Sequence, residues 1–164
     1  EIYTLSLHDA LPIFFTEEMV LVLPANHELS KKYHLPQDCH GTLPLLPIGL
    51  LKDMPFIQMH SEQKLHQQLL SLCAEAGFVP QIYLQTRSME TALTLASAGL
   101  GATLLPMTLL RAFQPETRPC YAALPTRPRR HALVAWRKKA YLSHAARAFI
   151  DLLVNYCRDK GDRV

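Results

Sequence analysis

Two short polar stretches in the sequence combine hydroxyl and basic side chains in a way that suits a small anion. His60 and Ser61 follow one apolar run, and Thr86, Arg87 and Ser88 follow another. Hydroxyl groups donate hydrogen bonds to carboxylate oxygens, and a charged histidine or arginine adds attraction for a negative ligand. These five residues are therefore candidate contacts for a small carboxylate or a similar anion.

Each polar stretch lies where the pattern predicts that a strand ends and a helix begins. Phe56–Met59 and Gln81–Gln85 are predicted strands, and helices are predicted from Glu62 to about Ala76 and from Met89 onwards. If the two strands are parallel neighbours, both junctions lie at one edge of the sheet, where ligands of open α/β sheets bind. The free N–H groups at the start of each helix would then also face the ligand.

A strand–helix–strand unit from Phe78 to Pro106 contains the second of these junctions. We predict that Gly99 ends its helix in the left-handed conformation, which glycine adopts without steric hindrance. The apolar run Ala102–Leu105 predicts a buried parallel strand. Between them, Gly101 would let a ligand or a neighbouring segment of chain approach the backbone closely, so we add it to the candidate contacts.

Ordinary structural roles are open for the same residues. Ser61 and Ser88 are also placed to be helix caps and nothing more. Arg87 could be a solvated surface arginine, and His60 could be a partly exposed histidine that contacts no ligand. The residue types alone do not decide between these roles and ligand binding.

The rest of the chain predicts one α/β domain without internal repeats. Its 164 residues are 49% apolar and 19% charged, which is typical of a globular protein. Besides the elements above, we expect strands at Phe15–Leu23 and His131–Trp136 and an extended segment at Cys120–Leu124. Short helices or turns are expected near Asn26–Glu28, Leu50–Met54 and Met107–Phe113, and a surface loop at His34–Leu46. Ser143 should cap a last helix, whose inward-facing residues would be Ala146, Phe149, Ile150 and Leu153.

Motifs of common enzyme classes are absent from the sequence. There is no G-x-S-x-G, Walker, G-x-G-x-x-G or H-E-x-x-H pattern, so we predict a protein that is not an enzyme and uses no cofactor. The four cysteines are scattered, and His34, Asp38, Cys39 and His40 lack the spacing of a metal site, so we expect reduced cysteines and no metal. No apolar run has membrane-spanning length.

Four segments, in this order, resemble the effector-binding domain of LysR-type transcriptional regulators. They are EEMVLVLPANHELS (Glu17–Ser30), LLKDMPFIQM (Leu50–Met59), QIYLQTRSMETALTLASAGLGATLLP (Gln81–Pro106) and WRKKAYLSHAARAFIDLL (Trp136–Leu153). The resemblance implies an α/β fold of the periplasmic-binding-protein-like type 2 class over residues 14–156. Residues from about 23 to 124 would form a nearly complete second subdomain, residues 14–22 and 125–156 part of the first, and residues 157–164 a charged, frayed tail.

The same resemblance implies a function. In this family a small inducer lies in a cleft between the two subdomains, and the junctions at His60 and Arg87 match inducer-contacting positions. The resemblance also implies a cytoplasmic protein that forms homo-oligomers through this domain and reads DNA only through a separate N-terminal winged helix-turn-helix, which this chain lacks. Two alternatives stay open: a solute-binding protein for transport, and a gene fragment without activity of its own.

Residues 1–13, EIYTLSLHDALPI, are similar to the in-frame translation of a common sequencing-library adapter. We therefore expect that they are not native and that the chain is truncated at its N-terminus, and we exclude them from fold reasoning. A truncated first subdomain would leave apolar surface incompletely covered around Val134, Trp136, Phe149 and Leu153.

Overall fold

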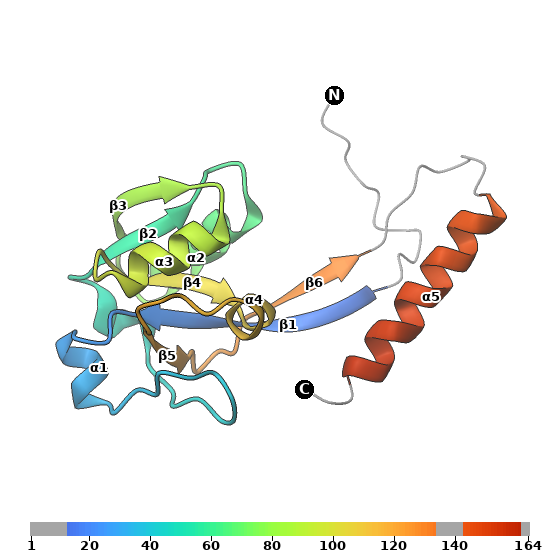
Figure 1. Cartoon of the computed structure of the whole chain (residues 1–164). Coiled ribbons are helices and arrows are strands. Elements are labelled where there is room, and N and C mark those ends of the chain that lie inside the picture. Colours follow the sequence, from blue (N-terminus) through green and yellow to red (C-terminus); the bar gives the residue numbers. More distant parts are fainter. Residues whose placement is uncertain (1–12, 134–142, 162–164) are drawn as a thin grey trace. The chain divides into compact units, whose positions relative to one another are not determined.

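The computed structural model describes residues 13–133 and 143–161 of the chain. The elements follow one another as β1 (Ile13–Leu23), α1 (Glu28–Lys32), the 3-10 helix η1 (Ile48–Leu51), β2 (Pro55–Met59), α2 (Lys64–Glu75), β3 (Gln81–Thr86), α3 (Met89–Ser97), β4 (Thr103–Pro106), α4 (Met107–Ala112), β5 (Cys120–Ala123), β6 (Arg129–Leu133) and α5 (His144–Gly161) (Figure 1). Most predicted elements are thus present with slightly shifted bounds.

The chain divides into two compact units. The larger unit is residues 18–128, and the smaller unit is residues 1–17 with 129–164. The larger unit overlaps the range of about 23–124 that we expected for the second subdomain. The assignment of the units to the two expected subdomains stays a prediction.

The strand β1 is the centre of the sheet in the larger unit. It pairs antiparallel with β4 on one side and with β5 on the other, so that Val20 lies opposite both Leu105 and Ala123 (Figure 1). The five residues Met19–Leu23 are fully buried. A strand with neighbours on both sides and apolar packing on both faces reads as a continuous apolar run, as MVLVL does.

Two further strands, β2 and β3, form a parallel pair in the same unit. Their register aligns Pro55 with Gln81 and Met59 with Thr86. The side chains of Phe56, Ile57, Gln58 and Met59 are buried, whereas Tyr83 is 60% exposed. Within the described residues, therefore, β2 is an inner strand and β3 is an edge strand.

The prediction of a parallel strand at Ala102–Leu105 was wrong about the direction of the strand. Only Ala102 forms a parallel bridge with Phe56, and from Thr103 onwards the chain pairs antiparallel with β1 as β4. The residues of β4 are all buried, as we expected. A continuous apolar run indicates burial on both faces but does not specify the direction of the neighbouring strand.

The segment His34–Leu46 is an irregular loop, as we predicted, but it does not lie wholly at the surface. It forms no helix or named strand, but Leu35, Leu43 and Leu46 are buried in the core. Its backbone bonds to β5, because the amide of Leu46 donates to the carbonyl of Ala123 at 2.8 Å and the amide of Ala123 donates to the carbonyl of Pro44 at 2.9 Å. This segment therefore covers the edge of β5 that faces away from β1.

The helix α2 presents the predicted apolar face to the core. Leu65, Leu69 and Leu72 are buried, and Cys73 is fully buried, as expected. The helix ends at Glu75, and Ala76, which we expected on the inner face, is exposed. As the residue after the last helical turn, Ala76 no longer follows the helical spacing that would turn it inward.

In the smaller unit, β6 pairs with the first part of β1. Thr16 and His131 are joined by a hydrogen bond between Oγ1 and Nδ1 at 2.8 Å, and Glu17 pairs with Arg130. Val134 and Trp136, which we expected in this region's strand and apolar surface, lie outside the described residues.

The last helix of the smaller unit, α5, begins after Ser143, whose hydroxyl accepts a hydrogen bond from the amide of Ala146 at 3.2 Å. This confirms the predicted cap. The helix continues to Gly161, beyond the end that we expected near Tyr156. Phe149 is 60% exposed, so it does not face inward as its spacing suggested, although its exposure agrees with an incompletely covered apolar surface.

The buried thiol of Cys73 gives a prediction for alkaline pH. Burial raises its pKa to about 11 from an ordinary value of 9.0. Between these values the unfolded chain loses the proton while the folded chain keeps it, so the free energy of unfolding should fall as the pH rises through this window and be unaffected by this group below pH 9. Each unit of pKa corresponds to about 1.4 kcal/mol, so the loss should approach about 3 kcal/mol once the pH exceeds both values.

Urea unfolding of wild type and Cys73→Ala at several pH values from 8 to 11 measures this effect. The variant should start less stable but lose less stability with pH, since the lysines and tyrosines that also titrate are common to both proteins. Equal pH dependence in the two proteins would contradict the assignment.

Candidate functional site

The two predicted junctions lie at the same edge of the β2–β3 pair. Met59, the last residue of β2, is aligned with Thr86, the last residue of β3, because the strands are parallel. Just beyond them, the amide of His60 donates to the carbonyl of Thr86 at 2.9 Å. The prediction that these strands are parallel neighbours with adjacent junctions is therefore confirmed.

The junction after β3 is fixed by its own hydroxyl groups. Ser88 is the N-cap of α3, and its Oγ accepts from the amide of Thr91 at 3.2 Å and donates to Oε2 of Glu90 at 3.2 Å. Oγ1 of Thr86 accepts from the amide of Ser88 at 3.1 Å. Ser88 is thus a helix cap, as one alternative held, while the Thr86 hydroxyl keeps its own hydrogen for donation.

The junction after β2 differs from the prediction because α2 begins at Lys64, two residues later than expected. Gln63, not Ser61, is the N-cap, and it makes no capping bond with its side chain. Ser61 lies exposed in the turn. The extra residues form a loop between β2 and α2, in which Glu62 and Gln63 approach the other junction.

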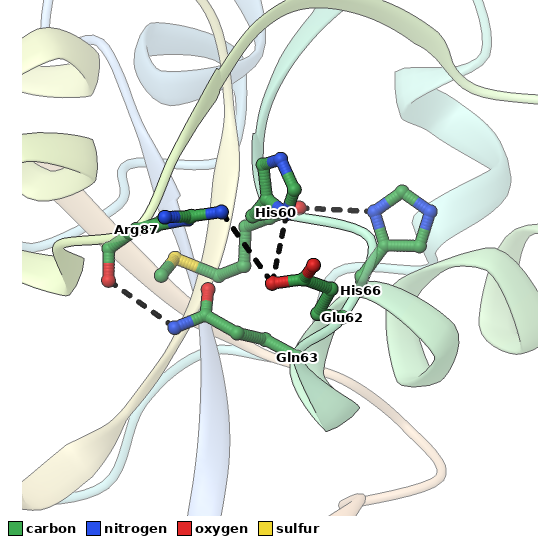
Figure 2. Close-up of polar contacts among 6 residues, drawn as sticks. His60, Glu62, Gln63, His66 and Arg87 are labelled. Atoms are coloured by element: carbon green, nitrogen blue, oxygen red, sulfur yellow. Dashed lines mark hydrogen bonds and ion pairs between the residues drawn. The ribbon is translucent and has the colours of Figure 1, made fainter.

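The two junctions are joined by side chains that the sequence analysis did not select. Nε2 of Gln63 donates to the carbonyl of Arg87 at 3.2 Å (Figure 2). Oε2 of Glu62 lies 3.5 Å from Nη2 of Arg87 and 3.7 Å from Nδ1 of His60. The only signal for Glu62 and Gln63 in the sequence was their position directly after the predicted contacts, and the predicted helix start assigned them to α2.

Two polar atoms at this edge are buried without a hydrogen-bond partner, namely Nδ1 of His60 and Oε1 of Gln63. The 3.7 Å between Nδ1 of His60 and Glu62 falls within ion-pair range but is too long for a hydrogen bond. Unpaired buried polar atoms are uncommon in folded proteins, and they indicate places where water or a ligand binds. Both atoms belong to residues of the β2–α2 loop.

The end of β2 is held in place by Gln58 and His66. Nε2 of Gln58 donates to the carbonyl of His66 at 3.1 Å. Nδ1 of His66 bonds to the carbonyl of Met59 at 2.9 Å, and Figure 2 shows this contact as the dashed line to the ring of His66. Gln58 is 3% exposed. The sequence signal for this positioning role was that Gln58 is a polar residue in an otherwise apolar strand.

Gly101 does not belong to this group. It lies against the first residue of β2, where the amide of Ala102 donates to the carbonyl of Pro55 at 2.9 Å. The other five candidate residues lie at or just after the last residues of β2 and β3, at the opposite end of the strands. Of the two roles that we considered for Gly101, the structure supports close approach of a neighbouring segment of chain.

The site is therefore a polar edge formed by two neighbouring loops. Arg87 supplies a cation, and α3, nine residues long, points its N-terminus at the same edge. In residues 13–133 and 143–161, no group of histidine, cysteine or carboxylate side chains could hold a metal ion. Over the same residues, no helix is both long and apolar enough to cross a membrane.

Comparison with known proteins gives consistent similarities. The family model "LysR substrate binding domain" matches residues 6–158. The uncharacterized HTH-type transcriptional regulator YwbI of Bacillus subtilis (strain 168) is 31% identical over 153 residues, which are 85% of this chain and 50% of YwbI. The C-terminal domain of a probable LysR family transcriptional regulator from Rhodococcus sp. RHA1 has a TM-score of 0.69 and 26% identity, over 93% of this chain and 70% of that one.

A further similar structure is the effector binding domain of QuiR in complex with shikimate. Its TM-score is 0.73 at 20% identity, over 91% of this chain and 65% of that chain. Together these similarities confirm the predicted α/β fold of the periplasmic-binding-protein-like type 2 class. The chain spans about half the length of YwbI, and the family match begins inside residues 1–13, whose suggested adapter origin stays a prediction.

Proposed function

Because the chain belongs to the family of LysR substrate-binding domains, we propose that it binds a small anionic metabolite at the edge formed by the ends of β2 and β3. The observation that supports this most is the juxtaposition of the two loops. It brings Arg87, the Thr86 hydroxyl and the start of α3 next to Nδ1 of His60, which is buried without a hydrogen-bond partner. These groups together favour a carboxylate.

The relatives support the same proposal. The related structure of QuiR contains shikimate, a small hydroxycarboxylate, and YwbI is named as an HTH-type transcriptional regulator. We propose that the complete protein is a cytoplasmic, homo-oligomeric DNA-binding regulator, in which this part senses the ligand without catalysing a reaction. The regulator names of the relatives favour this role over transport of a solute.

Titration calorimetry of the full chain against a panel of small carboxylates, shikimate included, tests the proposal. At least one compound should bind, and Arg87→Gln should weaken its binding about tenfold, because a hydrogen bond to a charged group contributes about 1.5 kcal/mol or more. Arg118→Gln, which removes an exposed arginine of the loop after α4, is the matched control and should leave the affinity unchanged.

The result separates the open alternatives. Binding that both arginine variants weaken equally would indicate general electrostatic attraction and would contradict the proposed site. No heat with any compound would favour a chain without ligand-binding activity of its own.

A further inference from the structure

We propose that the carboxylate of Glu62 is a built-in counter-ion of the effector site, and that the anionic group of the effector takes its place on binding. This inference rests on the proposed function and adds to it a residue that determines ligand specificity. Glu62 lies between the two junctions, and in this proposal its carboxylate oxygen occupies the position that an oxygen of the bound ligand would take.

The geometry places a single carboxylate oxygen between the nitrogens of two loops. Oε2 of Glu62 lies 3.5 Å from Nη2 of Arg87, which follows β3, and 3.7 Å from Nδ1 of His60, which follows β2 (Figure 2). With the imidazole hydrogen on Nδ1, both nitrogens are able to donate to a negative oxygen. The same two donors are those that we assign to the ligand carboxylate.

This internal pair is weak enough for a ligand to displace. Both distances are longer than those of a well-formed hydrogen bond between charged groups. The side chains of Arg87 and Glu62 are 72% and 73% exposed, and exposed ion pairs contribute little to stability because water and salt screen them. The carboxylate of Glu62 can therefore turn into solvent without a large loss of folding free energy.

The two buried atoms that lack a hydrogen-bond partner indicate which chemical groups the displacing ligand should have. Nδ1 of His60 and Oε1 of Gln63 are buried without a hydrogen-bond partner, although Oε2 of Glu62 lies 3.7 Å from the histidine nitrogen. A ligand that offers an anionic oxygen to His60 and Arg87, and a hydroxyl hydrogen to Oε1 of Gln63, would satisfy both atoms. We therefore assign the ligand to the class of small hydroxycarboxylates.

A purely structural role for Glu62 predicts the opposite behaviour. If Glu62 serves to hold the two loops together, its neutralisation should loosen them and weaken binding. If Glu62 is a competitor of the ligand, its neutralisation should strengthen binding, because the site loses both its internal anion and the repulsion that this anion exerts on a negative ligand.

The test is calorimetric titration of the chain described here, as wild type and as Glu62→Gln, with shikimate and other small hydroxycarboxylates at fixed ionic strength. Glu62→Gln should bind about five- to tenfold more tightly, the range expected for removing a weak exposed pair together with one nearby like charge. Glu75→Gln, at the exposed last residue of α2, is the matched control and should bind as wild type does.

A double variant distinguishes local competition from a general charge effect. In Arg87→Gln, the additional change Glu62→Gln should tighten binding by much less than it does in wild type, since the two residues act on the same ligand group. Unchanged or weaker binding by Glu62→Gln, or equal tightening by Glu75→Gln, would overturn the inference while the proposed site stands. Absence of binding to both wild type and Glu62→Gln would overturn the proposed function, and the inference with it.

Discussion

Replacing Gly101 with alanine is expected to lower the free energy of unfolding by about 3 kcal/mol or more, the upper range for overpacking in a core. A Cβ atom at this position would lie 2.4 Å from the carbonyl oxygen of Pro55 and 3.0 Å from its carbonyl carbon. These are backbone atoms of β2, and the amide of Ala102 bonds to the same oxygen, so neither segment can move aside without losing the contact between them.

Gly49→Ala is the matched control for this change. A Cβ at Gly49 would meet only the side chain of Ala76, at 4.0 Å, which is ordinary contact. Urea unfolding followed by circular dichroism should show a large decrease in the midpoint for Gly101→Ala and a small change for Gly49→Ala. Similar midpoints for the two variants would contradict the close approach of Gly101 to β2.

A second large effect is expected for Arg130→Met in the smaller unit. Arg130 pairs with Glu17, whose side chain is only 3% exposed. The substitution takes a positively charged partner away from this buried carboxylate without returning the carboxylate to water, and we expect a decrease of about 3 kcal/mol in the free energy of unfolding. Thermal and urea unfolding of the full chain measure it.

The chain contains its own control for this prediction, three residues earlier. Arg127 pairs with Glu18 at 3.2 Å, with side chains 48% and 20% exposed. Arg127→Met should therefore lower the free energy of unfolding by no more than about 1 kcal/mol. The double variant Glu17→Gln/Arg130→Met should regain part of the loss, and a double variant no more stable than Arg130→Met would argue against a charge effect.

The sequence predicted those elements of the fold well whose burial follows from a continuous apolar run or from apolar residues at helical spacing. The apolar run Met19–Leu23 and the stripe Leu65, Leu69 and Leu72 are buried as expected. The direction of β4 and the covering role of the segment 34–46 depend on which strand lies next to which. That is a property of tertiary packing, and an apolar pattern is compatible with several arrangements.

The candidate site was predicted in part for the same reason. His60, Thr86, Arg87 and Ser88 follow from the rule that ligands bind where parallel strands end. Glu62 and Gln63 were missed because α2 begins at Lys64 and the boundaries of a helix are poorly specified by sequence. Gly101 was misplaced because its closest contact, Pro55, is distant in the sequence, and contacts between distant residues cannot be read from the sequence alone.

The bonds between the two junctions have a consequence for signalling. The amide of His60 donates to the carbonyl of Thr86, and Nε2 of Gln63 donates to the carbonyl of Arg87, so we expect these loops to move together. If a metabolite contacted only these two loops, it would bind equally well in every arrangement of the rest of the protein. A ligand shifts a conformational equilibrium only when it binds one of the two states more tightly than the other. For the proposed sensor to report occupancy, the bound molecule must therefore also touch a group outside this rigid pair of loops.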